Sequence, residues 1–253
     1  MLIITLTYLT AVTLFGPYMM RKRKPMQNLI WPIRAYNAFM VLFNGYLFVS
    51  FSKKLNWGLD CWGCGKSMKR LDQSGLVVWE LVLLSRYFDF FDSIFFVCRK
   101  KFDHLTVLHV LHHTLVPICV WFAGKLDPTP MLAFAGYINL PIHVIMYTYY
   151  GLSTFPALKE YLWWKKYLTG IQIVQFLIDL VHSFQVFYFR SCKFHTLTYI
   201  QAAFSLAFLY LFGQFYLRNY LRKKWNPVIT RKENQKQNGL SPVLNSTNGK
   251  KLE

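Results

Sequence analysis

Seven long apolar segments, separated by short polar and basic stretches, run through this sequence. Each is close to the roughly 20 residues that a helix needs to cross the hydrocarbon core of a bilayer. Because lipid offers no partners for backbone N–H and C=O groups, and because the segments are too long for barrel strands, we expect helices. The sequence therefore predicts an all-α, polytopic membrane protein with about seven transmembrane helices. The expected spans are residues 2–20, 34–51, 76–98, 105–124, 131–151, 168–189 and 196–217.

The composition favours a bilayer over a nucleic acid as the main partner. The chain is 54% hydrophobic and 16% charged, with a formal net charge of +18, whereas about a quarter of the residues in soluble domains are charged. Its Lys and Arg residues gather between the apolar segments, where membrane proteins place them beside anionic headgroups. We therefore expect membrane lipid, and no nucleic acid, as a partner.

Basic residues also predict the orientation. If the N-terminus is lumenal, the cytosolic connections and the membrane-proximal tail carry fourteen Lys and Arg residues, and the lumenal loops carry eight. Cytosolic loops are enriched in these residues, so we expect a lumenal N-terminus and a cytosolic C-terminus. The loop 52–75 runs against this trend.

The two ends of the chain predict how it is anchored and where it resides. No basic region precedes the first apolar segment, and a basic cluster at 21–24 follows it, so we expect a retained span rather than a signal peptide. Residues 1–225 are expected to form the membrane-embedded domain, and the polar residues 226–253 a disordered cytosolic tail. The tail contains Lys250 and Lys251 near its end, which match a dilysine retrieval signal and predict the endoplasmic reticulum membrane.

Ionisable groups inside predicted spans are costly at membrane depth and mark functional candidates. Arg86, Asp89 and Asp92 recur every three residues in the third span, so that Arg86 can pair with Asp89. An ion pair that only fixes helix packing remains an equal alternative.

Histidines form the most specific pattern. His109, His112 and His113 make an H-x-x-H-H sequence that projects three imidazoles from one helix face, which packing alone does not explain. The next two spans add Asn139 and His143, and then Gln172, Gln175, Asp179 and His182, a seam that can also join helices.

The depth of these groups predicts a tunnel. In the orientation above, the histidines and their polar neighbours lie in the cytosolic half, while the lumenal halves are mostly aromatic and aliphatic. We therefore expect the second to seventh spans to enclose a tunnel with a polar mouth and an apolar floor.

Clustered histidines suit two kinds of chemistry. A diiron lipid oxidase or desaturase needs several histidine boxes by analogy, and this chain has one box and seven histidines in total, which leaves only a mononuclear metal site open. Alternatively, a neutral imidazole can attack a thioester or act as a base near neutral pH. A seven-helix receptor needs no triple-histidine face, and a transporter usually shows internal repeats, which this sequence lacks.

Five blocks follow one another in order between about residues 14 and 225: 16–19 with 23–25, 36–37, 99–101 with 108–113, 139–150, and 169–176. In this order and spacing they resemble the ELO family of very-long-chain fatty-acid elongases. The family pattern K-x-x-E-x-x-D-T aligns with Arg86, Asp89, Asp92 and Ser93, so three of its four positions differ in reach, which questions rate or substrate choice rather than fold. The chain also begins inside its first span, where family members carry additional residues, so the resemblance implies a divergent or shortened member.

The resemblance implies a condensing acyltransferase, a very-long-chain 3-oxoacyl-CoA synthase that joins acyl-CoA to malonyl-CoA without a metal or redox cofactor. It implies that His112 carries the acyl group, that His143 acts as partner base or second contact, and that His109, His113 and Asn139 support them. Basic residues at the cytosolic side are candidates to hold CoA phosphates, with topology charges as the alternative: Arg99, Lys100, Lys101, Lys165 and Lys166.

The resemblance also implies separate reductases and a dehydratase as partners in the elongation cycle. The sequence leaves open the acyl length and unsaturation, whether the chain forms a homo-oligomer, and whether Cys61 pairs with Cys64.

Overall fold

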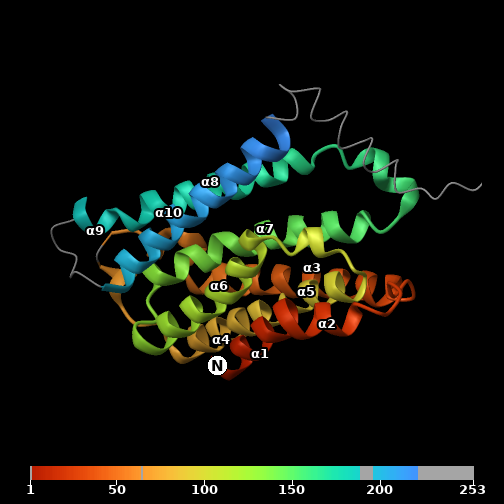
Figure 1. Ribbon diagram of the computed structural model, residues 1–253. Coiled ribbons are helices and arrows are strands. Elements are labelled where there is room, and N and C mark those ends of the chain that lie inside the picture. Colours follow the sequence, from red (N-terminus) through yellow and green to blue (C-terminus); the bar gives the residue numbers. More distant parts are fainter. Residues whose placement is uncertain (1, 64, 189–195, 222–253) are drawn as a thin grey trace, which may run out of the picture. The chain divides into compact units, whose positions relative to one another are not determined.

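A computed structural model describes residues 2–63, 65–188 and 196–221 (Figure 1). These residues form helices and connecting loops, and none of the described ones lies in a strand. The chain divides into two units, residues 1–212 and 213–253. In the second unit, the described residues are the end of the last long helix and a π-helical turn, Leu217–Leu221. Most of the predicted tail, including Lys250 and Lys251, lies outside the described residues.

Helices occupy every predicted span. Among the residues that the structure describes, five helical segments are long and apolar enough to cross a membrane: Leu2–Met20, Val107–Leu126, Pro130–Leu152, Lys165–Phe187 and Thr196–Leu221. The all-α, polytopic prediction is therefore confirmed. The helices are α1 (Leu2–Thr10), α2 (Gly16–Met20), α3 (Ile30–Lys54), α4 (Gln73–Phe88), α5 (Phe90–Cys98), α6 (Val107–Leu126), α7 (Pro130–Leu152), α8 (Lys165–Ser183), α9 (Gln185–Tyr188) and α10 (Thr196–Tyr216).

The second and third predicted spans are helical but differ from the other five. Helix α3 buries Asn37 and Asn44 among its apolar residues. The predicted span 76–98 begins earlier, at Gln73, and is interrupted at Asp89, which separates α4 from α5. The buried asparagines lower the apolar character of α3. The interruption at Asp89 divides the span 76–98 into two shorter helices.

The apolar core of the first unit lies between α3, α4 and α7. Leu47, Phe51, Trp79, Val82 and Leu140 are among its buried members. The indole N–H of Trp79 reaches α6, where it donates to the carbonyl oxygen of Val120 at 3.0 Å. Buried indole donors normally find such a partner, and this one fixes how α4 and α6 pack.

Loop contacts define two ends of the helix bundle. At one end, here called the mouth, the amide of Met26 donates to the carbonyl of Cys98 at 3.0 Å, and Arg34 donates to the Thr154 hydroxyl at 3.0 Å. At the other, here called the far end, the amide of Leu71 donates to the carbonyl of Pro128 at 2.9 Å. The histidine box therefore begins at the mouth, close to the start of α6.

The far end is held by side chains of α8 and α9. The carbonyl oxygen of Cys61 accepts hydrogen bonds from His182 Nε2 at 2.9 Å and Gln185 Nε2 at 3.2 Å. The His182 ring also stacks on Phe134 with centroids 3.8 Å apart. His182, part of the polar seam in the sequence, thus anchors the connection between α3 and α4.

The packing of α4 on α6 predicts the effect of a single methyl group. A Cβ at Gly124 would lie 2.5 Å from Trp79 Nε1, whereas a Cβ at Gly170 of α8 would meet nothing within 4 Å. We expect Gly124→Ala to lower the melting temperature, because the buried indole must move. Gly170→Ala, the matched control, should be neutral or stabilising, by up to about 1 kcal/mol. Thermal unfolding of the two variants in the same detergent checks this, and equal melting temperatures would contradict the packing described.

Candidate active site

The guanidinium of Arg86 is the centre of a buried polar network. Arg86 is 3% exposed and lies in the last turn of α4. Its Nη2 donates to Asn44 Oδ1 of α3 at 2.8 Å, and its Nη1 donates to Asn139 Oδ1 of α7 at 3.1 Å. The same Nη1 lies 3.2 Å from Asp89 Oδ2. Arg86 therefore satisfies its donors on three elements at once, and the predicted pairing with Asp89 is present.

Two carboxyl groups meet at the hydroxyl of Tyr147. The Tyr147 hydroxyl lies 2.7 Å from Asp89 Oδ1 and 2.8 Å from Asp92 Oδ2. It also lies 3.1 Å from the hydroxyl of Tyr36, which itself lies 3.0 Å from the carbonyl oxygen of Phe88. These contacts connect α3, α5 and α7 and supply partners that buried carboxyl groups require.

His143 belongs to this network. Arg86 Nη1 lies 2.9 Å from its Nδ1 and 2.8 Å from its Nε2. A guanidinium only donates, so the imidazole nitrogen that accepts from it carries no proton. His143 is one turn beyond Asn139 on α7, and both side chains contact Arg86, as their spacing allows.

The three histidines of α6 do not share one environment. Consecutive residues of an α-helix point about 100° apart because each turn has 3.6 residues. His109 and His113, one turn apart, lie with ring centroids 4.1 Å from each other and ring planes tilted by 38°. His112 points elsewhere, and its ring centroid lies 5.3 Å from that of Phe208 on α10.

His109 is held by a hydroxyl chain. Its Nε2 lies 2.8 Å from Ser93 Oγ of α5, which lies 2.8 Å from the Tyr8 hydroxyl of α1. Thr106, the N-cap of α6, accepts from the His109 amide at 3.2 Å and fixes where the helix begins. His113 is buried, and its Nδ1 has no hydrogen-bond partner within the part of the chain that the structure describes.

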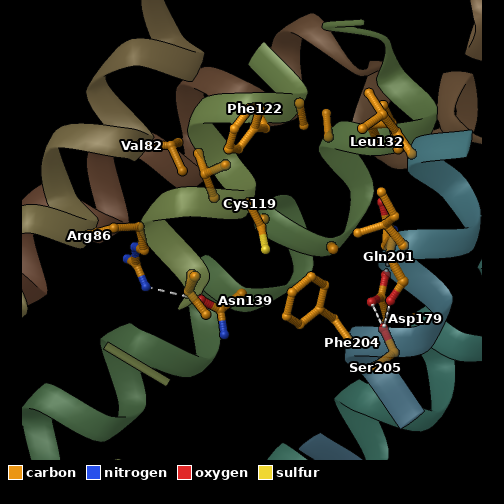
Figure 2. Close-up of a pocket in the computed structure, with 18 of the residues that line it drawn as sticks. Val82, Arg86, Cys119, Phe122, Leu132, Asn139, Asp179, Gln201, Phe204 and Ser205 are labelled. Carbon is orange, nitrogen blue, oxygen red and sulfur yellow. Dashed lines mark hydrogen bonds between the residues drawn. The ribbon is translucent and has the colours of Figure 1, made fainter. Parts of the chain in front are cut away.

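A cavity of about 490 Å³ lies between α3, α4, α6, α7, α8 and α10 (Figure 2). These helices correspond to the second to seventh predicted spans, so a cavity is present among the helices where the tunnel is expected. Its lining is mostly apolar. The polar side chains in the lining are Arg86, His112, Asn139, Gln175, Asp179, Gln201 and Ser205.

His112 is the imidazole that reaches this cavity. Among the described residues, the other histidines of the sequence pattern and His143 are not part of the lining. Neither Asp89, Asp92 nor Gln172 is in the lining; the Gln172 amide instead contacts Met146 Sδ at 3.9 Å. Gln175 does line it and accepts from Asn139 Nδ2 at 3.2 Å.

The predicted apolar floor is interrupted by a polar group. Asp179 accepts from Gln201 Nε2 at 2.9 Å and from the hydroxyl of Ser205, and all three residues line the cavity. Figure 2 shows them on one side of the cavity, with Arg86 and Asn139 on the other.

Similarity to known proteins agrees with this architecture. The family model described as GNS1/SUR4, the ELO family, matches residues 1–227. The chain belongs to the ELO family. It is 36% identical to very long chain fatty acid elongase 7 of Drosophila melanogaster over 93% of this chain and 73% of that protein. It is 37% identical to elongase 7 of Rattus norvegicus, over 85% and 78%, and 34% identical to human elongase 1, over 88% and 82%.

Basic residues of this ELO-family chain gather at the mouth. Burial, and then Arg99 and Lys159 nearby, lower the pKa of Lys101. Burial, and then Lys101 and Lys165, lower the pKa of His104. Residues from two different loops are thus close enough to repel one another. Lys100 Nζ lies 3.5 Å from the Arg21 carbonyl, and Lys166 Nζ lies 4.9 Å from the centre of the Tyr167 ring.

Some members of the site do not stand out in the sequence. Asn44 sits in a predicted span, and a buried amide at membrane depth is a signal that points to it. The amide of Gln201, in the span 196–217, carries the same signal, whereas Tyr147 and Ser205 do not, because tyrosine and serine are common in membrane helices. Within residues 2–63, 65–188 and 196–221, no three His, Cys, Asp or Glu side chains gather in a way that could hold a metal ion.

The departures from the ELO family pattern predict a coupled pair. Arg86 is forked where the family has Lys, and Asp89 is shorter than the family's Glu. The ammonium of Arg86→Lys cannot reach Asn44, Asn139 and Asp89 together, and Asp89→Glu overfills the space beside it. We expect each variant to lower the melting temperature and the double variant to lose less than the sum, with a coupling energy of roughly 0.5–3 kcal/mol.

Arg34→Lys combined with Asp89→Glu is the control for this cycle. Arg34 binds Thr154 at the mouth and does not touch Asp89, so the two effects should add. If the stability losses of Arg86→Lys and Asp89→Glu also add, Arg86 and Asp89 are not coupled.

Proposed function

We propose that this chain is the condensing enzyme of fatty acid elongation, a very-long-chain 3-oxoacyl-CoA synthase. Its reaction joins an acyl-CoA to malonyl-CoA and gives a 3-oxoacyl-CoA two carbons longer, carbon dioxide and free CoA. The observation that carries the proposal is His112, an imidazole at the wall of a mostly apolar cavity lined by six helices. The names of the relatives, all very long chain fatty acid elongases, support it.

The first half of the reaction needs a nucleophile beside an apolar channel. A neutral nitrogen of His112 attacks the thioester carbon, the C–S bond breaks, and CoA leaves as a thiol after taking up the proton that the imidazole loses. The acyl group then rests on the imidazole. Its hydrocarbon chain lies along the apolar wall, which keeps water from the intermediate.

The second half uses malonyl-CoA as the carbon nucleophile. Loss of carbon dioxide leaves an enolate, which attacks the acyl carbon. The bond to the His112 nitrogen breaks, and this nitrogen takes up a proton from water, which restores the neutral imidazole. Neither half requires a metal or a redox cofactor.

Neighbouring polar groups have supporting roles in this scheme. Asn139 lines the cavity. Arg86 holds its carbonyl oxygen at 3.1 Å and Gln175 accepts one amide hydrogen at 3.2 Å, which leaves the second N–H for a ligand. Such a preorganised donor can stabilise an oxyanion. His143 acts as partner base or second contact, with Arg86 holding its ring. His109 and His113 orient His112.

Basic residues at the mouth bind CoA in this scheme. Arg99, Lys100, Lys101, Lys165 and Lys166 supply charge for the phosphates. His104, whose pKa the neighbouring cations lower, takes up a proton more readily once a phosphate offsets that charge, so binding strengthens as the pH falls through its pKa.

The cellular setting follows from the same scheme. CoA substrates are cytosolic, so the mouth faces the cytosol, with a lumenal N-terminus and a cytosolic C-terminus in the endoplasmic reticulum membrane. Lys250 and Lys251 serve as the retrieval signal. Separate reductases and a dehydratase complete each elongation cycle.

The nucleophile is tested by one substitution. We expect His112→Ala to abolish incorporation of labelled malonyl-CoA into acyl chains, because no other imidazole of the described residues reaches the cavity. Leu111→Ala is the matched control, since Leu111 is 39% exposed and on the outside of the same turn. The measurement uses microsomes or purified protein with acyl-CoAs of graded length, together with gel filtration as a check of folding. Retained activity in a folded His112→Ala protein would refute the assignment.

The CoA site predicts a charge-reversal effect. We expect the double variant Lys101→Glu, Lys165→Glu to raise the KM for acyl-CoA by at least about tenfold, since it replaces attraction to the phosphates by repulsion. The effect should shrink as salt is added. Lys69→Glu, in the loop at the far end, is the control and should leave KM unchanged. If the KM rises as much for Lys69→Glu as for the Lys101→Glu, Lys165→Glu variant, the CoA site lies elsewhere.

A further inference from the structure

The proposed reaction does not explain why the cavity contains a second polar group away from His112. Asp179 is 4% exposed and lies on α8 among apolar lining residues. Its two oxygens accept one hydrogen bond each, from Gln201 and Ser205 of α10. A carboxyl group at membrane depth is costly to keep and marks a functional site by default.

Joining α8 to α10 does not by itself require a carboxyl group. A neutral Asn or Ser at position 179 would bond to α10 with a smaller desolvation cost, and neutral side chains are the usual join between membrane helices. What a carboxyl group adds is acceptor capacity. Its two oxygens offer about four lone-pair positions, of which Gln201 and Ser205 use two. Because Asp179 lines the cavity, its two unused lone-pair positions are available to a group bound there.

The spacing of residues along α10 places this group beyond the first carbons of a bound chain. Phe208 of α10 contacts the His112 ring, with centroids 5.3 Å apart. Ser205 and Gln201 lie three and seven residues before Phe208, which is about 4.5 and 10.5 Å along the helix at 1.5 Å per residue. An acyl group attached at His112 therefore passes Asp179 beyond its first carbons.

We propose that Asp179, positioned by Gln201 and Ser205, is a recognition site for a hydroxyl group carried part-way along the acyl chain. This inference rests on the proposed function and names the substrate class of the same cavity. A methylene group has no hydrogen to donate to the carboxyl oxygen. A hydroxyl group at the matching carbon donates to it, whereas a hydroxyl near the methyl end is buried among apolar lining residues without this partner. The site thus discriminates by position along the chain as well as by the presence of the hydroxyl.

The test compares three acyl-CoAs of equal length with the wild-type protein. One is unsubstituted, one carries a mid-chain hydroxyl, and one carries a hydroxyl next to the methyl end. We expect kcat/KM for the mid-chain hydroxy ester to exceed that for the other two by at least about tenfold, the effect of one hydrogen bond to a charged group. Incorporation of labelled malonyl-CoA gives all three values.

Two substitutions assign the preference to Asp179. Asp179→Val removes the acceptor oxygens, so the ratio of kcat/KM for the mid-chain hydroxy ester to that for the other esters should fall to about one. Asp179→Asn keeps the shape of the side chain with a neutral acceptor, so this ratio should lie between the wild-type value and one. Because the readout is a ratio, a loss of rate common to all esters cancels, and the Asn variant serves if the Val variant does not fold. Leu206→Ala, on the exposed side of α10 next to Ser205, is the control and should keep the wild-type ratio.

The outcomes separate this inference from the proposed function. A wild-type protein that elongates none of the esters refutes the proposed function. One that elongates them with equal kcat/KM, or whose preference survives in Asp179→Val, refutes the hydroxyl site and leaves the condensing activity in place.

Discussion

Burial of the Arg86 guanidinium is the interaction on which the arrangement of the site depends. A buried cation without partners would cost far more than a domain's net stability allows, so the structure must bring acceptors to it. They come from α3, from the α4–α5 junction and from α7, through Asn44, Asp89 and Asn139. Between membrane helices there is little hydrophobic drive, so packing and polar contacts of this kind set their register.

The helices and the Arg86–Asp89 pair are predictable from the sequence, because both follow from spacing along one element. The break at Asp89 is not, since a stretch that is helical on both sides gives no sign of one interrupted turn. Contacts between different helices are not predictable either, because the sequence of one helix does not show which neighbour it faces. A stripe of His109, His112 and His113 reveals a polar helix face, but only the position of α10 and α5 shows that His112 turns to the cavity and His109 to Ser93.

The depth of polar residues in the predicted spans predicts part of the cavity lining. The polar groups of α4, α6 and α7 lie toward the mouth, and most of the remaining lining is apolar, as the distribution of residues predicts. Asp179 is visible in the sequence as part of a seam, but the two side chains that donate to it are not. Gln201 and Ser205 sit in a helix whose buried residues are few, so nothing in that segment alone identifies them as its partners.

The contact of Tyr8 with Ser93 connects the first helix to the histidine box. Tyr8 stacks on Phe90 with ring centroids 4.0 Å apart and ends a chain of three polar groups that begins at His109. The serine oxygen carries a single hydrogen, so it can donate to the imidazole or to the phenol but not to both. When His109 Nε2 accepts from the serine, the phenol can donate to the serine oxygen; when Nε2 carries the proton and donates, the serine hydrogen is free to turn to the phenol. The amino-terminal helix is thereby coupled to proton positions in the histidine box.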